Sequence, residues 1–110
     1  MAHGSRDPEW SRPFERLAAA LQEKLPAVSV ALCYLEHGPS LEEALAAVVA
    51  KGAGSVRVVP VFLGAGGHVK DDIPRLVAAA HPPVPVTVDP PIGEQAALID
   101  AIAAGIASPR

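Results

Sequence analysis

Residues 56–63 read VRVVPVFL, a nearly continuous apolar run of strand length, and the glycine-rich segment Gly64–Gly67 follows it directly. Strands that are apolar on both faces are typical of parallel sheets covered by helices on both sides. Pro60 lies inside the run, although proline prefers the edges and bulges of a sheet. This stretch predicts a buried parallel strand that ends in a glycine-rich loop.

Helical and strand patterns alternate on both sides of this stretch. VSVALCYL at 28–35 and the short run 84–88 predict two further strands. Four helices are predicted. One covers 12–25, a second begins after Ser40, which forms a capping box with Glu43, a third lies near 72–80 and the last covers 94–107. The alternation predicts one α/β domain over residues 1–110, with a parallel sheet between two helical layers and right-handed crossovers.

The two terminal helices carry clear apolar faces. In the helix at 12–25, which Pro26 ends, that face is formed by Phe14, Leu17, Ala18, Leu21 and Leu25. Asp7 and Pro8 offer an earlier start as cap and first residue, but Pro13 would then lie inside the helix, so the start stays open. The last helix is expected to bury Leu98, Ile99, Ile102 and Ile106.

Length and composition exclude several classes of protein. The chain has 110 residues, of which 50% are hydrophobic but only 4% aromatic, so its core is thin and subunit interfaces are a natural expectation. A net charge of −3 argues against nucleic-acid binding. No apolar run approaches ~18 residues, and the N-terminus resembles no signal peptide. The single cysteine, Cys33, is expected in the core. We therefore expect a soluble cytoplasmic protein with no membrane or nucleic-acid partner.

Chemistry-bearing residues gather in the loops that would follow the strands. Ligands of open parallel sheets bind beyond the carboxyl ends of the strands, which selects the loops 36–40, 64–70 and 89–94. The segment 3–7 joins them if a strand precedes it. These loops contain Glu36 and three of the four histidines: His3, His37 and His68. The fourth, His81, lies at the other end of its helix and is expected to be an exposed loop residue.

Imidazole and carboxylate groups suit divalent Co, Fe, Ni or Zn. The wide separation of His3 and His68 carries no local metal-binding signature, so ordinary polar loop residues are the alternative. The glycine-rich loop lacks the lysine of a phosphate-binding loop, so no nucleotide is expected.

Three segments together resemble one known family: AHGSRDP at 2–8, YLE…PSL at 34–41 and VVPVFLGAGGHVKDDIP at 58–74. They resemble the small CbiX-type sirohydrochlorin cobaltochelatases, class II chelatases with a flavodoxin-like fold. The resemblance covers almost the whole chain, and Gly93-Glu94 is similar to the late loop of the family. AHGSR followed at this distance by F-L-x-x-G-x-H-x-x-x-D-I-P is its most specific part.

The resemblance implies an enzyme that inserts a divalent metal, with Co²⁺ favoured, into sirohydrochlorin for cobalamin biosynthesis without ATP. Iron insertion for sirohaem and nickel insertion are alternatives within the family. His3 and His68 match the metal-binding histidines of the family. His3 also matches the residue that accepts the pyrrole protons, and Glu36 matches the acidic residue at the substrate site. The loop expected to contact the macrocycle comprises Leu63, Gly64, Ala65, Gly66, Gly67 and His68.

These residue types suit the implied reaction. Two imidazoles hold a metal ion through few ligands, which can be exchanged for the ring nitrogens, whereas a closed cage would retain it. A histidine that titrates near neutrality can accept the expelled pyrrole protons. Arg6 and Lys70 are candidate partners for substrate carboxylates, with solvated surface charge as the alternative.

Two departures from the family are expected to matter. The strand that normally precedes AHGSR is absent, so the chain is clipped, its start is misassigned, or another strand fills the gap, for example in a dimer. The second departure is the loop at Glu36-His37-Gly38, which is slightly shorter than expected for the family; His37 is either a third ligand or, as we favour, exposed. Small family members resemble half of a two-lobed chelatase, so a homodimer around the substrate is expected. A non-catalytic metal- or tetrapyrrole-binding module, and a subunit that needs a different partner, remain alternatives.

Overall fold

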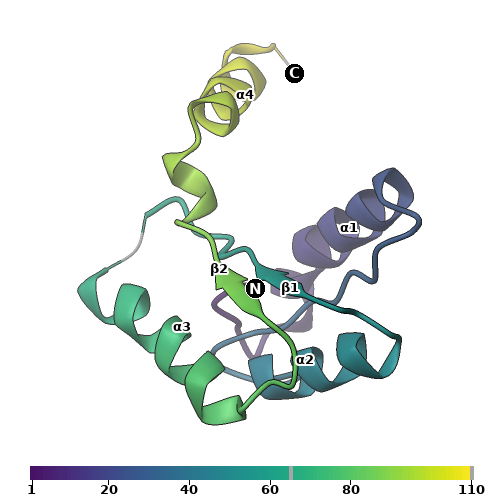
Figure 1. The fold of residues 1–110 in the computed structure, drawn as a ribbon. Coiled ribbons are helices and arrows are strands. Elements are labelled where there is room, and N and C mark those ends of the chain that lie inside the picture. The colour runs from purple at the N-terminus through teal and green to yellow at the C-terminus, as the bar shows by residue number, and fades with distance from the viewer. Residues whose placement is uncertain (65, 110) are drawn as a thin grey trace.

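The computed structural model describes residues 1–64 and 66–109, with the backbone alone for residues 67–70. The helices and strands of this part of the chain (Figure 1) follow in the order α1 (Pro8–Lys24), α2 (Leu41–Ala50), β1 (Val56–Val58), α3 (Gly67–Ala80), β2 (Val86–Val88), the 3-10 helix η1 (Ile92–Glu94) and α4 (Ala96–Ala107). β1 and β2 pair in parallel, with Val56 opposite Val86 and Val58 opposite Val88. The predicted mixed α/β class is confirmed.

Helix α1 takes the earlier of its two predicted starts. The Asp7 side chain accepts a hydrogen bond from the backbone N–H of Glu9 at 3.0 Å, and Pro8 occupies the first turn, where its missing N–H costs nothing. Pro13 lies inside the helix, as that start requires. At the other end, the Gln22 side chain donates to the carbonyls of Leu25 (3.0 Å) and Val28 (2.6 Å) and thereby fastens the turn after the helix.

Helices α2 and α3 cover the main core. The predicted capping box begins α2: Ser40 Oγ accepts from the N–H of Glu43 at 3.1 Å, and the Glu43 side chain accepts from the N–H of Ser40 at 3.4 Å. Helix α3 begins at Gly67, earlier than predicted, and ends at an exposed His81, as expected for that residue. The buried cluster comprises Met1, Cys33, Leu41, Ala44, Leu45, Val58 and Ile73.

The prediction of a strand at 28–35 is wrong: within the described residues this segment contributes only an isolated parallel bridge, between Ala2 and Tyr34. A strand forms only where a neighbour completes its hydrogen-bond ladder. Residues 33–36 have such a neighbour in the first residues of the chain, but residues 28–32 have none among the described residues. The predicted strand 56–63 is shortened to β1, because β2 pairs with only its first residues. Residues 59–62 still hydrogen-bond to Met1 and to residues 92–93, but outside the named strands.

Met1 and Ala2 lie between the segment that follows β1 and residues 33–36. The amino group of Met1 donates to the Val59 carbonyl at 2.9 Å, and the N–H of Val61 donates to the Met1 carbonyl at 2.7 Å. On the other side, the N–H of Ala2 donates to the Cys33 carbonyl at 2.9 Å. Ala2 is 0% exposed. These two residues therefore join segments that are otherwise far apart in the sequence.

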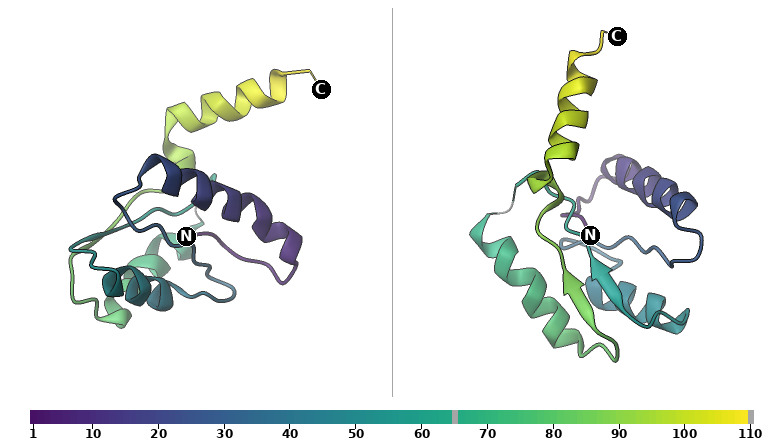
Figure 2. Two further views of the ribbon diagram at one scale, coloured as in Figure 1. Left: turned by 90° about the vertical axis from the view of Figure 1, so that its right-hand side faces the viewer. Right: turned by 45° about the horizontal axis from the view of Figure 1, so that its top comes forward.

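The helices lie on two sides of the strands and the N-terminus, with α2 and α3 on one side and α1 and α4 on the other (Figure 2). The expectation that α4 buries Ile99 and Ile106 is wrong, since they are 47% and 81% exposed. The predicted helix 94–107 breaks at Gln95 into η1 and α4, and α4 projects away from the core. None of the described helices combines the length and apolar character needed to cross a membrane.

Candidate functional site

Loops that the sequence places after different strands meet at one edge of the sheet. The His3 carbonyl accepts hydrogen bonds from the N–H of Leu35 at 3.1 Å and of Glu36 at 2.8 Å. The N–H of Gly93 donates to the Phe62 carbonyl at 2.9 Å, which attaches the late loop to the end of the segment after β1. The described backbone thus joins the loop at 3–7 to the start of the loop at 36–40, and the loop at 89–94 to Phe62, whose ring lies beside His3.

His3 and Glu36 form an exposed pair at this edge. The Nδ1 atom of His3 lies 3.6 Å from Oε1 of Glu36, and the two side chains are 51% and 61% exposed. The His3 ring also meets Phe62 edge to face, with ring centroids 6.1 Å apart. A carboxylate beside Nδ1 favours the tautomer with its proton there, which leaves the Nε2 lone pair of His3 for a metal ion.

The close crossing of the two loops depends on Gly4. Its φ angle is +103°, and a Cβ atom there would lie 3.0 Å from His37 Cδ2, 3.1 Å from Glu36 Cβ and 3.2 Å from Tyr34 Cβ. Only glycine adopts this backbone without strain and leaves room for those neighbours. A Cβ atom at Gly93 would likewise overlap the Leu63 backbone. Sequence reasoning missed both roles, although each glycine lies in a loop that it had selected.

The glycine-rich loop is only partly described. Leu63 is 66% exposed, and Gly64 and Gly66 are exposed as well. Ala65 lies outside the described residues. The backbones of Gly67 and His68 form the start of α3, while the side chains of His68 and Lys70 lie outside the described part. The remaining basic candidate, Arg6, is exposed. Among the side chains that the structure does describe, no group of three His, Cys, Asp or Glu residues could hold a metal ion.

The expectation that His37 is exposed is wrong, because its ring is partly buried under the first loop. Nδ1 lies 2.7 Å from the Gly38 carbonyl, and the ring stacks on Tyr34 with centroids 4.3 Å apart. Nε2 is enclosed and meets no hydrogen-bond partner in the described part of the chain. The physical reason is the close approach of Gly4, which covers this ring.

Burial perturbs two ionisable groups behind the site. Desolvation lowers the pKa of the Met1 amino group, and the neighbouring Cys33 opposes this shift. Cys33 is 4% exposed, which confirms its expected core position, and this burial raises the pKa of its thiol. On the rim, Arg57 binds Asp89 through Nη2 at 2.6 Å, and this contact raises the pKa of the guanidinium.

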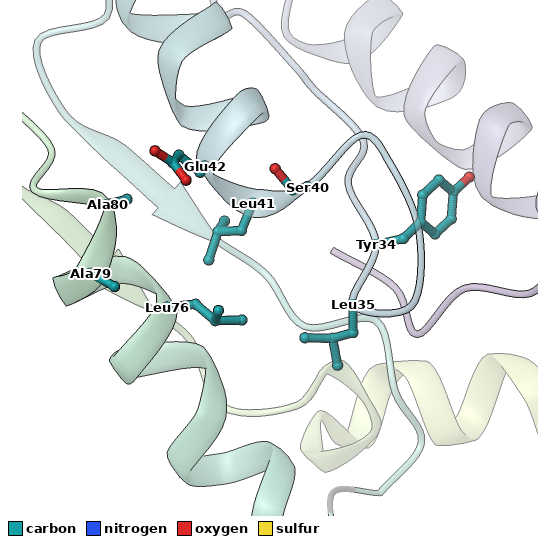
Figure 3. A pocket seen from close by; sticks show the side chains of 8 residues that line it. All are labelled: Tyr34, Leu35, Ser40, Leu41, Glu42, Leu76, Ala79 and Ala80. Carbon is teal, nitrogen blue, oxygen red and sulfur yellow. The ribbon is translucent and has the colours of Figure 1, made fainter.

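A cavity of about 160 Å³ lies beside the site and not within it. Leu35, Leu41 and Leu76 point into this space, whereas the Tyr34 ring turns away from it (Figure 3). Its other lining residues are Ser40, Glu42, Ala79 and Ala80. Pockets for drug-sized ligands measure roughly 300–1,000 Å³. This cavity is therefore too small for a tetrapyrrole, and the exposed His3–Glu36 pair does not line it.

Comparison with known proteins identifies one family. The family model described as CbiX matches residues 1–108. A sirohydrochlorin cobaltochelatase of Saccharolobus islandicus is 41% identical over 76 residues, 68% of this chain and 58% of that protein. The match thus spans less than two thirds of that relative's length. The sirohydrochlorin cobaltochelatase of Sulfolobus acidocaldarius is 30% identical over 98 residues, 89% of this chain and 79% of that protein.

Solved structures agree with this assignment. A CbiX protein of Marinobacter aquaeolei VT8, named for cobalamin biosynthesis, is 31% identical with a TM-score of 0.79, covering 96% of this chain and 88% of that one. The cobalt complex of the sirohydrochlorin chelatase SirB from Bacillus subtilis subspecies spizizenii is also 31% identical, with a TM-score of 0.68. There the match covers 96% of this chain but 47% of the SirB chain.

Proposed function

The chain belongs to the CbiX family, and on that premise we propose that it inserts Co²⁺ into sirohydrochlorin, without a nucleotide, as a step of cobalamin biosynthesis. The observation that carries this proposal is the exposed pairing of His3 with Glu36 at the loop edge of the sheet. An imidazole with a carboxylate 3.6 Å away can both bind a divalent metal and take up a proton.

The metal ion is a substrate in this reaction, and His3 together with His68 is proposed to present it to the macrocycle. Few protein ligands are an advantage, since each bond to the protein must be exchanged for a bond to a ring nitrogen. Glu36, whose carboxylate lies 3.6 Å from Nδ1, is proposed to orient the His3 imidazole. Leu63, Gly64, Ala65, Gly66 and Gly67 are proposed to contact the ring, and the exposed Leu63 offers it an apolar surface.

Insertion releases two pyrrole protons for each metal ion. His3 is proposed to accept them at its imidazole once the metal has moved into the ring, and Glu36 to pass them to solvent. The roughly half-exposed state of both side chains supports this relay, because water reaches each of them. Arg6 and Lys70 are proposed to bind carboxylates of the substrate.

The macrocycle is proposed to bind between two copies of the chain. The 160 Å³ cavity formed by described residues cannot hold it, and the His3 and Glu36 side chains are exposed in a single copy. The match to 47% of the SirB chain supports a homodimer in which each copy corresponds to one half of that enzyme. In this proposal each copy is a flavodoxin-like half-domain with a three-layer arrangement.

The proposal is tested by following the absorbance of sirohydrochlorin with Co²⁺ and purified protein. Insertion faster than the spontaneous reaction supports it. A rate equal to the spontaneous one, with Co²⁺ still bound, would instead favour a non-catalytic binding module. Because SirB has been solved with cobalt and with Fe³⁺, the same assay with Fe²⁺ and Ni²⁺ decides between cobalt and the other metals.

A further inference from the structure

We propose that His37 is a positioning residue for His3: its ring supports the Gly4 turn and thereby holds the His3 imidazole beside Glu36 and Phe62. This inference rests on the proposed role of His3 in metal insertion. It assigns a function to the one loop histidine that neither the metal pair nor the proton relay uses.

The ring of His37 is held on two sides. One face stacks on Tyr34, with an interplanar angle of 32° and centroids 4.3 Å apart. Its Cδ2 edge lies so close to Gly4 that a Cβ atom there would be 3.0 Å away. The Gly38 carbonyl only accepts, so Nδ1 of His37 donates to it, at 2.7 Å, and this bond sets the rotation of the ring.

With its proton on Nδ1, neutral His37 carries a lone pair on Nε2. That atom is enclosed without a hydrogen-bond partner in the described part of the chain. It is therefore not presented to a metal ion in this arrangement. A buried polar atom without a partner is unfavourable for folding, and such groups in native structures call for a functional explanation. The shape and position of the ring, more than its nitrogen chemistry, account for His37 here.

The contacts of His37 lead directly to His3. Gly4 is the next residue after His3, and the His3 carbonyl is fixed to the N–H groups of Leu35 and Glu36. Without the ring below Gly4, the turn loses its support and the His3 imidazole is free to move from Phe62. A displacement of about 1 Å at a reacting group lowers a rate by on the order of 100-fold.

Beyond Tyr34, the aromatic neighbours continue into helix α1. The Trp10 ring lies 6.4 Å from that of Tyr34 and 4.6 Å from that of Phe14, centroid to centroid. Three of the four aromatic residues of the chain are thus connected to His37 by ring-to-ring neighbours, while the fourth, Phe62, lies edge to face with His3. The aromatic side chains therefore support the site loop from both sides.

The test compares His37→Ala, which removes the ring, with His37→Phe, which keeps a flat ring but no nitrogen. Nuclear Overhauser contacts between the ring protons of His3 and Phe62 report the position of His3 without any need for activity. We expect the Phe variant to keep this contact and the Co²⁺ affinity, and the Ala variant to lose the contact and bind Co²⁺ about 10- to 100-fold more weakly. His81→Asn, at an exposed histidine with φ 47°, is the matched control.

Circular dichroism shows whether each variant is folded. If His37→Ala does not fold, His37→Asn replaces it, since an amide keeps the bond to Gly38 but lacks the ring. The proposal is overturned if the ringless variant keeps the His3–Phe62 contact and full Co²⁺ affinity, or if His37→Phe loses both. Failure of the wild type to insert metal would contradict the proposed function, while the His3–Phe62 contact would still decide the role of His37.

Discussion

Glu36 donates its backbone N–H to the carbonyl of His3 at 2.8 Å, and its carboxylate lies 3.6 Å from the imidazole of the same residue. One residue thus contacts the backbone and the side chain of the other. The backbone bond aligns the two loops, and the carboxylate orients the imidazole on the solvent side.

Glu36→Gln keeps the backbone bond but removes the charge. We expect Co²⁺ affinity or the insertion rate to fall about 10- to 100-fold, the usual effect of losing a group that orients a metal-binding histidine. Stability should be nearly unchanged, because an exposed pair contributes little to folding. Isothermal titration with Co²⁺ and the absorbance assay measure both quantities. Glu15→Gln, on the exposed surface of α1, is the control; equal effects of the two substitutions would contradict the role of Glu36.

Gly4→Ala should disturb both the fold and the site. A non-glycine residue at φ +103° and three contacts of 3.0–3.2 Å both oppose the added methyl group. We expect a loss of about 1–3 kcal/mol in the free energy of unfolding, measured with urea, together with weaker Co²⁺ binding. Gly54→Ala is the matched control, because a Cβ atom there meets nothing within 4 Å. Wild-type stability of Gly4→Ala would show that the loops do not cross as described.

The sequence predicted the features that depend on neighbouring residues better than those that depend on contacts with distant parts of the chain. The capping box of Ser40 and Glu43 and the Asp7–Pro8 start of α1 need only neighbouring residues, and both are present. The strand at 28–35 needed a partner along its whole length, which its own residues do not reveal.

The same difference between features set by neighbouring residues and features set by distant contacts applies to the site. The rule for parallel sheets and the family resemblance selected His3 and Glu36, and the structure brings these two together. The enclosure of His37 went unpredicted, because it depends on Gly4 crossing above it from another part of the chain. Whether His68 joins His3 stays a prediction.

Stability should depend on pH through the buried Met1 amino group. Burial lowers its pKa below the ordinary value of 8.0, so the unfolded chain binds more protons in the window between the lowered value and 8.0. The free energy of unfolding should therefore rise as pH increases through that window. Above the ordinary thiol pKa of 9.0, stability should fall, since burial raises the pKa of Cys33 and only the unfolded thiol ionises readily.

Urea unfolding at a series of pH values measures this profile, with intact mass confirming that Met1 is retained. Acetylation of the amino group removes its charge but keeps an N–H for the Val59 carbonyl. Acetylation should abolish the rise in the free energy of unfolding toward pH 8.0 and leave its fall above pH 9.0. An identical profile for the acetylated protein would contradict the buried position of the amino group.

An engineered apolar extension before Met1 should stabilise the sheet. Met1 and Ala2 already bridge two segments, so four added β-branched residues would run on between residues 28–33 and β1. We expect a higher free energy of unfolding and slower hydrogen exchange at the N–H groups of Cys33 and Val59. An extension of equal length containing proline and glycine is the control, because it cannot complete the ladders. Equal stability of the two extended proteins would contradict the position of Met1 and Ala2 between these two segments.

The central claim is that His3 and His68 present the metal to the macrocycle. The measurement that tests it most directly is the rate of Co²⁺ insertion into sirohydrochlorin by the wild type, His3→Ala, His68→Ala and His81→Asn under identical conditions. The account predicts insertion above the spontaneous rate for the wild type and His81→Asn, and loss of that acceleration in both alanine variants, each folded by circular dichroism. Wild-type turnover in either alanine variant would contradict it.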